Sequence, residues 1–487
     1  MPELNELKNA CETGMRFLEK QKNAKQFEVF ASENKLDVFR LCLASNVPSN
    51  ALEESKSMDF FGLSIRVLFD DGKTGFGKTD SEFGLDGIKK AFDKAKHSKV
   101  LDPDFHSFPE PKGKPIQINF PDRKIMDFNE EKGIDLSYSC LNSALTELNG
   151  IKANSKNKNL KFNLTGELDF LSEKISVMNS NGINEFDEST VALGNLTTIF
   201  ESKPEVSGMW FDCGVSLNKF DAEKIGFTSV QKAKALINGK HLNSGKYNVV
   251  FGPLAFADLL YSRLDLNLGS VDMQASPFTG KLDSVIADEK ISIYDDGLKE
   301  NALGTKKITC EGIPTSKTPL IEKGKLVNYL SNDYYAKKYS SDKRFNSANG
   351  FRFGGIGRDY ASEPGIYSTN LVVKKGDYSQ EELFKEIKDG IYIGRIWYTY
   401  PVNGPTSSDF TSTIRGDSFI IENGEITSPL VPNTLRINDN FERILMNVPG
   451  LTKKRFPALA WGEESIVLTP EVAVKELNVK RIAKGLY

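Results

Sequence analysis

Residues 72–79, GKTGFGKT, fit the G-x-x-x-x-G-K-[ST] pattern in which a glycine-rich loop holds nucleotide phosphates. In such a site a helix begins at the Lys-Thr pair, because its first N–H groups complete the phosphate cradle. Here Asp71-Gly72 is a hairpin signal between LSIRVLF and TGFGKT, and the next helical pattern begins only near Leu85. We therefore predict a β-hairpin rather than a nucleotide-binding site at the four matching positions, Gly72, Gly77, Lys78 and Thr79.

Patterns for metal binding and nucleophilic catalysis are equally weak. The three histidines, His97, His106 and His241, form no i, i+4 pair of the kind found in helical zinc sites. The sequence has no G-x-S-x-G nucleophile elbow. Asp258 and Asp265 are seven residues apart near a predicted helix, which favours a solvated acidic stripe over an oxygen-rich metal site. The residues therefore predict neither a catalytic residue nor a metal site in this chain.

The composition is that of an ordinary globular protein, and 487 residues suffice for two or three domains. The net charge of -3 gives no electrostatic reason to expect a nucleic acid or an anionic membrane as a partner. The first 23 residues are charged and amphipathic, and no window of about 18 apolar residues occurs. The five cysteines form no C-x-x-C pair. We expect a cytoplasmic protein without a membrane span.

The elements that must position these residues indicate an α+β fold. In the N-terminal half the hydrophobic periodicity predicts helices near 3–22, 130–149 and 221–238. Strands are predicted at 27–32 and 35–45, joined by a polar turn at Glu33-Asn34, and four antiparallel strands between 160 and 217. The proline-rich stretch 98–130 is predicted to be an irregular connection between subregions of the chain.

The C-terminal half is predicted to be rich in β-structure. A strand at 247–251 precedes an apolar helix with Pro253 in its first turn, and further helices are expected at 379–389 and 439–447. We therefore predict an N-terminal α/β domain with a mixed sheet and flanking helices (residues 1–235) and a β-rich domain (residues 236–487).

Two C-terminal segments have an unusual composition. In RFGGIGRDYASEPGIYSTNLVV, from residue 352, the GGIG stretch is either a tight turn or a set of backbone amides that bind an extended peptide or an anion. NGPTSSDFTSTIRGDSFIIENGEIT, from residue 403, predicts a loop followed by two strands with an Asn-Gly turn.

Several blocks occur in the same order as in the TldD/PmbA family, historically called modulator of DNA gyrase, and the chain resembles that family over residues 1 to about 480. The blocks are GLSIRVLFDDGKTGFGKTD, VVFGPLAFADLL, EGIPTSKTPLIEKGKLVNYLSNDYYA, STNLVVKKGDYSQEEL and SSDFTSTIRGDSFIIENGEITSPL. The resemblance implies a two-part α+β architecture, a hairpin at 62–79 and a cytoplasmic peptidase system.

The catalytic branch of the family carries H-E-x-x-x-H on the helix after the V-V-x-x-P block and a cysteine near the C-terminus as a further zinc ligand. Here Tyr261, Ser262 and Asp265 stand roughly at the motif, and Ala458 to Trp461 near the place of the cysteine. Tyr and Asp do not replace two imidazoles and a thiolate around zinc. The chain therefore resembles the PmbA branch, also called TldE, whose members lack the zinc motif.

The resemblance implies a non-catalytic subunit that acts on unfolded or precursor peptides. It pairs with an H-E-x-x-x-H paralogue of TldD type, which carries the zinc, or forms a homodimer; no cofactor is expected in this chain. The residues expected to line the peptide cleft are Tyr261, Asp265, Asn403, Ser408 and Asp409.

Two other interpretations remain open. One is a self-sufficient peptidase whose active site is assembled from dispersed groups. The other is a binding protein that regulates a topoisomerase or toxin system, as the historical family name suggests.

Overall fold

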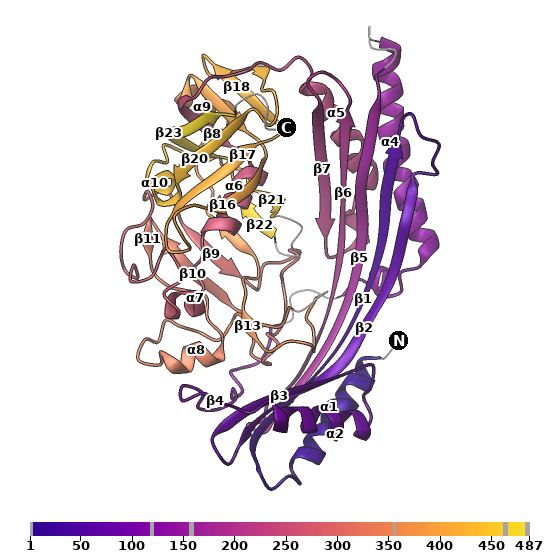
Figure 1. Ribbon diagram of the computed structural model, residues 1–487, viewed down its shortest axis with the longest axis vertical. Helices are drawn as coiled ribbons and strands as arrows, with labels where there is room; N and C mark the ends of the chain where they lie inside the picture. The colour runs from indigo at the N-terminus through magenta and orange to yellow at the C-terminus, as the bar shows by residue number, and fades with distance from the viewer. Residues whose placement is uncertain (1–2, 117–120, 155–159, 354–356, 461–465, 483–487) are drawn as a thin grey trace.

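The computed structural model describes residues 3–116, 121–154, 160–353, 357–460 and 466–482. It consists of two halves that lie side by side, a long curved sheet with its helices and a C-terminal half built on shorter strands (Figure 1). The α+β fold class is confirmed. Among the described residues, no helix is both long and apolar enough to cross a membrane.

The N-terminal half is built on one seven-stranded sheet in which every pairing is antiparallel. Parallel and antiparallel pairs occur together only in the two larger sheets of the C-terminal half, among the described strands, and not in this sheet, for which the sequence predicted them. In spatial order the strands are β4 (Val100–Leu101), β3 (Lys73–Asp80), β2 (Leu52–Phe69), β1 (Ala24–Ala44), β5 (Phe162–Asn179), β6 (Asn184–Phe200) and β7 (Val206–Gly214).

The N-terminal helices cover one face of this sheet. On β1 the odd-numbered residues face them: Val29 packs with α1 and α2, and Phe39 packs with α4 and α5. The helices and helical turns are α1 (Leu4–Leu18), α2 (Leu85–His97), α3 (Arg123–Met126), α4 (Glu130–Asn154), η1 (Leu217–Lys219) and α5 (Ala222–Ala235).

Two sequence predictions in this sheet are wrong. Glu33-Asn34 does not form a turn, because β1 continues through both residues as a single strand of 21 residues paired with β2 and β5. The region from 160 to 217 contains three strands rather than four, since β5 continues through the polar residues 172–174. In both places buried polar residues interrupt the apolar pattern without ending the strand.

The hairpin at 62–79 is confirmed. Phe69 and Lys73 flank the turn, β2 pairs with β3, and α2 begins only at Leu85. A Cβ at Gly77 would lie 2.0 Å from the carbonyl oxygen of Ala91, so this glycine allows α2 to pack directly on β3. Gly77 of the nucleotide-like pattern thus serves helix–strand packing, whereas Gly72 lies in the hairpin turn with a φ of 75°.

The C-terminal half contains two larger sheets and one hairpin. The eight-stranded sheet has the order β16 (Ile396–Pro401), β17 (Asp409–Ile414), β20 (Leu435–Asn440), β23 (Val472–Arg481), β8 (Gly245–Phe251), β15 (Gly390–Ile393), β18 (Ser418–Glu422) and β19 (Glu425–Pro429). The six-stranded sheet has the order β11 (Lys325–Leu326), β10 (Lys317–Glu322), β9 (Ile293–Asp296), β14 (Leu371–Val373), β22 (Ile466–Thr469) and β21 (Phe456–Leu459). Strands β12 (Gly350–Phe351) and β13 (Gly365–Ile366) form the hairpin. The pairs β8–β15 and β14–β22 are parallel.

Helix α6 (Pro253–Arg263) lies between these two sheets, where it contacts β8 and β16 of one and β21 and β22 of the other. Apolar side chains cover most of its circumference, so the largest core of the protein forms around it. The remaining helices are α7 (Leu268–Asp272), α8 (Asp333–Lys338), α9 (Gln380–Ile387) and α10 (Phe441–Met446).

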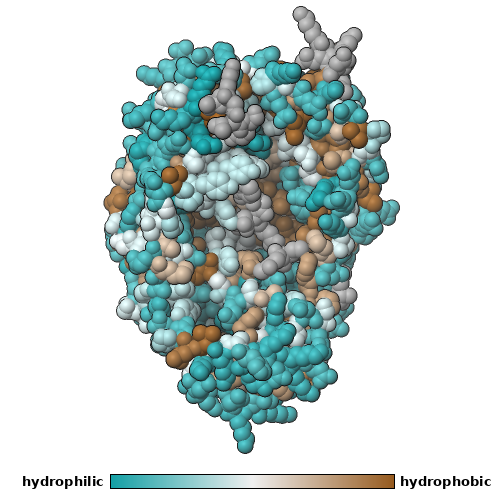
Figure 2. Space-filling model, viewed as in Figure 1, coloured by the Kyte–Doolittle hydropathy of each residue, from teal (hydrophilic) through white to brown (hydrophobic). Residues whose placement is uncertain are grey.

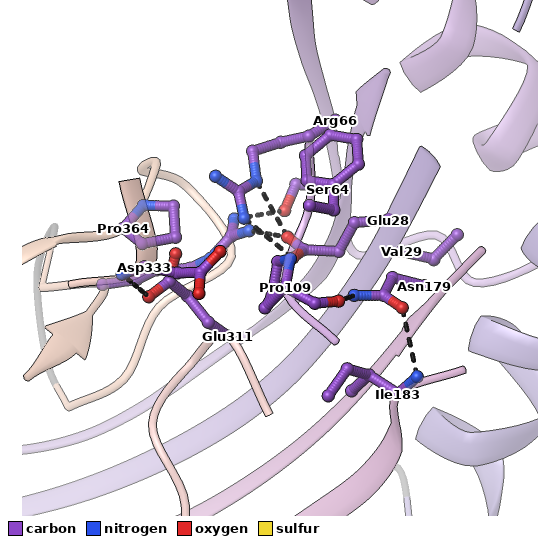
Figure 3. A network of polar contacts seen from close by, with 12 residues as sticks. Glu28, Val29, Ser64, Arg66, Pro109, Asn179, Ile183, Glu311, Asp333 and Pro364 are labelled. Carbon is purple, nitrogen blue, oxygen red and sulfur yellow. Dashed lines mark hydrogen bonds and ion pairs between the residues drawn. The ribbon is translucent and has the colours of Figure 1, made fainter. Parts of the chain in front are cut away.

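The two halves meet through buried charges on the other face of the long sheet. Glu28 of β1 accepts hydrogen bonds from Arg66 of β2 and from Arg352, which comes from the C-terminal half and approaches at 2.5 Å (Figure 3). Both arginines hold the pKa of Glu28 below its usual range, against the opposing effect of burial. The connection 102–122 joins the same junction, since Lys112 contacts Asp333 of α8.

Candidate functional site

Helix α6 carries Tyr261 and Ser262, two of the positions at which the sequence suggested altered metal ligands, and Asp265 follows its end. Gly252 precedes it, and Pro253 occupies its first turn, where a missing N–H costs nothing. Tyr261, in the last turn, is 46% exposed, whereas Asp258 and Arg263 are buried. The helix therefore presents one aromatic side chain to solvent and two charged side chains to the protein.

The donor set on α6 does not fit zinc. If Tyr261 and Ser262 take the first two places of an H-E-x-x-x-H pattern, the last place falls on Leu266, which is buried in the core, and not on Asp265. A leucine offers no metal ligand. In the part of the chain that the structure describes, no three His, Cys, Asp or Glu side chains are grouped so as to hold a metal ion. Trp461, at the end of the segment compared with the zinc-binding cysteine, lies outside the described residues.

Four of the five predicted cleft residues, Asp265, Asn403, Ser408 and Asp409, lie in or beside segments that contact Arg263 at the end of α6. The Arg263 guanidinium donates to the backbone oxygen of Ser407 at 2.6 Å, and the charges of Asp265 and Asp409 act on it. Asp409 accepts hydrogen bonds from Asn440 at 2.8 Å and from Asn403 at 3.0 Å. These two amides hold the pKa of Asp409 below its usual value. The loop 402–408 is thereby fixed to the end of α6.

Ser408 takes part in this arrangement from its buried side. Its hydroxyl donates to Glu442 at 2.5 Å, and Glu442 also receives the Lys281 ammonium at 2.6 Å. Tyr261 lies two positions before Arg263 and so on the opposite side of the helix. Among the five residues, Tyr261 and Asn403 are the ones that the structure leaves exposed.

The structure corrects the expectation for Asp258. It is buried rather than solvated, and its Oδ2 accepts a hydrogen bond from Thr399 of β16 at 2.8 Å, while Thr399 and Ser412 are 2.9 Å apart. Burial raises the pKa of Asp258 to about 6, although the Thr399 hydroxyl opposes the shift. The spacing of Asp258 from Asp265 could not reveal its hydrogen bond to Thr399, because Thr399 lies 141 positions further along the chain.

Strand β16 carries an aromatic surface that sequence reasoning missed. It is the terminal strand of its sheet, and the pairing with β17 is irregular between Trp397 and Tyr400. Tyr398 and Tyr400 are 51% and 53% exposed, and their rings stack with centroids 5.8 Å apart. The alternation W-Y-T-Y in the sequence was the available signal.

The GGIG stretch can be followed only in part. Residues 354–356 lie outside the described residues, and the prediction of a turn or an amide-lined site there is not tested. On either side of it, Arg352 and Arg358 are fully buried against the long sheet. Arg358 donates to Glu173 of β5 at 2.7 Å and to Asp187 of β6 at 3.0 Å.

Comparison with known proteins shows which proteins have a similar sequence and fold. The family model "PmbA/TldA metallopeptidase C-terminal domain" matches residues 244–481, and "PmbA/TldA metallopeptidase domain 1" matches residues 49–98. An uncharacterized protein of Methanocaldococcus jannaschii is 28% identical over 384 residues, which are 77% of this chain and 82% of that protein. A metalloprotease of the same organism is 28% identical over 228 residues, 46% of this chain and 47% of that protein.

A solved structure gives the same result for the fold. TldE from Thermococcus kodakarensis matches with a TM-score of 0.80 and 22% identity, over 98% of this chain and 100% of that one. The two family models together span more than half of the sequence. This chain belongs to the TldD/PmbA family.

Proposed function

We propose that this chain is a non-catalytic, TldE-like subunit of a metallopeptidase complex, in which a TldD-type partner with an H-E-x-x-x-H motif carries the zinc. The observation that carries the proposal is the set of side chains at the motif positions: Tyr261 and Ser262 in the last turn of α6 and Leu266 just after the helix, within a fold otherwise like that of the family. Phenol, hydroxyl and alkyl groups provide neither the imidazoles for zinc nor a carboxylate base for a metal-bound water.

The chain's own task in the complex is to hold an unfolded peptide. Strand β16 supports this, because it is the terminal strand of its sheet among the described residues, and a strand in that position can pair its outer edge with the backbone of an extended peptide. Such pairing is independent of the peptide's sequence, while the exposed rings of Tyr398 and Tyr400 cover its side chains. The loop around Asn403 follows β16 directly and is fixed through Asp409 to the end of α6.

The proposal is tested by mixing the purified chain with the H-E-x-x-x-H paralogue from its own cells. We expect a complex by size-exclusion chromatography with light scattering, and hydrolysis of an unfolded polypeptide that a chelator abolishes. The chain alone should not hydrolyse the peptide. Chelator-sensitive hydrolysis by the isolated chain would instead favour a self-sufficient peptidase.

The peptide-holding role predicts an effect of the β16 tyrosines. Replacing Tyr398 and Tyr400 with alanine should weaken binding of an extended peptide by about 30-fold, because each of the two rings contributes on the order of 1 kcal/mol of contact. Fluorescence anisotropy of a labelled peptide on the complex measures this. Tyr138→Ala, which removes an exposed tyrosine of α4, is the matched control and should leave affinity unchanged. Equal affinity in all three proteins would exclude β16 as the peptide site.

A further inference from the structure

A cavity of about 310 Å³ lies at the junction of the two halves, at the start of α6. Its apolar wall comes from β7 (Trp210 and Phe211), from α6 (Leu254) and from β21 (Phe456). We call it the seam pocket. Strand β7 is terminal in the long sheet and β21 is terminal in the six-stranded sheet, so the pocket lies where two sheets end. Figure 2 shows the surface hollowed between the two halves.

The volume and the lining suit a small organic group. Ligand sites in proteins begin at roughly 300 Å³ and are mostly apolar with a few polar groups that fix orientation. Two aromatic residues, Trp210 and Phe456, line the pocket from different halves of the chain. Phe456 is 43% exposed, so this apolar wall is not closed off as a core would be.

Two of the three carboxylates at the pocket have a cation nearby. Asp417 forms an ion pair of 3.1 Å with Lys232, whose ammonium also lies 5.2 Å from the centre of the Trp210 ring. Asp212 accepts hydrogen bonds from two backbone N–H groups and has the Lys224 charge nearby. Lys232 and Lys224 therefore offset the charges of Asp417 and Asp212.

Glu471 is the third carboxylate at the pocket. It is 4% exposed, and its Oε1 accepts hydrogen bonds from the neutral groups of Gln380 at 2.5 Å and Tyr392 at 3.2 Å. Within the described part of the chain it forms no ion pair. Burial raises the pKa of Glu471, and the hydrogen bonds from Gln380 and Tyr392 offset this rise only in part. A cationic ligand group would supply the missing charge.

A second cavity shows that Glu471 has space beside it. This cavity, of about 230 Å³, shares Phe456 and Glu471 with the seam pocket and is otherwise lined by the start of α9 and by Lys453 and Lys454. A ligand held at Glu471 thus has room for an apolar group in one cavity and for the rest of its length in the other.

We propose that the seam pocket binds a ligand with an apolar body and one cationic group, with the body between Trp210 and Phe456 and the cation at Glu471. Two sources share this chemistry: a free hydrophobic amine, and the N-terminal residue of a peptide with its α-ammonium group. Binding of a peptide N-terminus rests on the proposed function, whereas binding of a free amine is argued from the pocket alone.

The test is isothermal titration calorimetry on the full chain without a partner. Phenylalanine amide carries the apolar body and the cation, and N-acetylphenylalanine amide carries the body alone. We expect saturable binding of the first and at least about tenfold weaker binding of the second, because the neutral probe leaves Glu471 uncompensated. The same pair of end groups on a six-residue peptide distinguishes the two sources.

Two variants assign the site. Glu471→Gln should weaken the cationic probe about tenfold and leave the neutral probe unchanged, whereas Phe456→Ala should weaken both. Glu425→Gln, on the exposed strand β19, is the matched control and should change neither. Phe456→Ala removes an exposed ring, so it keeps the test valid if Glu471→Gln fails to fold.

The outcomes separate this inference from the proposed function. Equal binding of the two probes, or binding of the cationic probe that Glu471→Gln leaves intact, would overturn the assignment. Preference for the cationic amine without any binding of the peptide would support a small-ligand site. Failure of the complex to hydrolyse peptides would overturn the proposed function and leave the calorimetric result unaffected.

Discussion

Asp258 is a buried acid whose side chain accepts a hydrogen bond from β16, across from α6. Thr399 satisfies one carboxylate oxygen, while the other, Oδ1, has no hydrogen-bond partner among the described residues. Burial penalises the ionised carboxylate and the Thr399 hydroxyl opposes this only in part, so the neutral form is favoured more than in an exposed aspartate. Asp258 therefore links α6 to β16, the strand proposed to bind the peptide, and the free-energy cost of its burial depends on pH.

The raised pKa of Asp258 gives a signed prediction. In the unfolded chain an aspartate titrates near pH 4, and in the folded protein burial raises the pKa to about 6. The favourable effect of the shift is fully present below pH 4 and is lost as pH rises through 6. Asp258→Asn should therefore be more stable than the native protein at pH 7, by about 2–3 kcal/mol, and show no such gain at pH 4.

Thermal unfolding midpoints at pH 4, 5, 6 and 7 measure this difference. Asp86→Asn, which changes an exposed acid in the first turn of α2, is the control and should show no comparable trend. A constant difference between Asp258→Asn and the native protein across this range would contradict the raised pKa.

Sequence alone could identify α6 but not the environment of its charged residues. The run VVFGPLAFADLL predicts an apolar helix behind a buried strand, and the structure has both. Most of this helix is covered by protein, and Asp258 lies on the covered side, whereas the spacing of Asp258 and Asp265 suggested a solvated stripe. The structure links Asn403 and Asp409 to the end of α6 through Arg263, while the prediction that the five residues line a peptide cleft stays a prediction.

At the scale of elements, the polar interruptions of β1 and β5 have one common cause. Asn34 and Glu173 are paired across the two strands, directly beside the pair Glu33–Lys174. Arg358 of the C-terminal half contacts both Asn34 and Glu173 there. The sequence predicted strand breaks because these residues are polar, and the physical reason for their polarity, a docking arginine more than 180 positions away, is invisible to local periodicity.

This ion cluster predicts a large effect of Arg358→Met. Glu173 would keep Lys306, at 3.0 Å, but would lose the hydrogen bonds of the buried guanidinium. Removing one partner of a buried ion pair costs roughly 3–5 kcal/mol, because the remaining charge stays desolvated. We expect a clear fall in the thermal midpoint, measured by circular dichroism.

Arg40→Met is the matched control, since Arg40 lies on β1 and forms a solvent-exposed ion pair with Glu54 at 2.7 Å. Exposed pairs contribute at most about 1 kcal/mol, so the control should unfold close to the native midpoint. Similar midpoints for the two variants would show that Arg358 does not hold the halves together.

At the scale of the whole molecule, the two halves are joined by charged and polar contacts as well as by apolar packing. Phe30 of β1 packs with Ile308 and Phe351 of the C-terminal half, and the charges around Glu28 lie beside this apolar patch. The connection 102–122 adds contacts to α8, where Lys337 donates to the backbone oxygens of Ser107 and Phe108. The junction therefore depends on the ionisation of its buried groups.

Glu311 makes this dependence testable. It is buried beside Asp333, whose backbone N–H donates to it at 3.0 Å, and burial together with the charge of Asp333 raises its pKa to about 7. Arg66 opposes the shift and Glu28 adds to it, while Lys112 and Lys337 pair with Asp333. The stabilising effect of the protonated form is present in acid and is lost as pH rises through 7.

Glu311→Gln removes this titration, so its thermal midpoint should rise relative to the native protein between pH 6 and pH 8. Glu12→Gln, in an exposed pair on α1, is the control and should follow the native protein at both values. Since Glu311 lies at the junction, the change should shift the unfolding of both halves together, seen as one transition by circular dichroism. A pH-independent difference would mean that Glu311 is ionised in the folded protein and that the junction tolerates its charge.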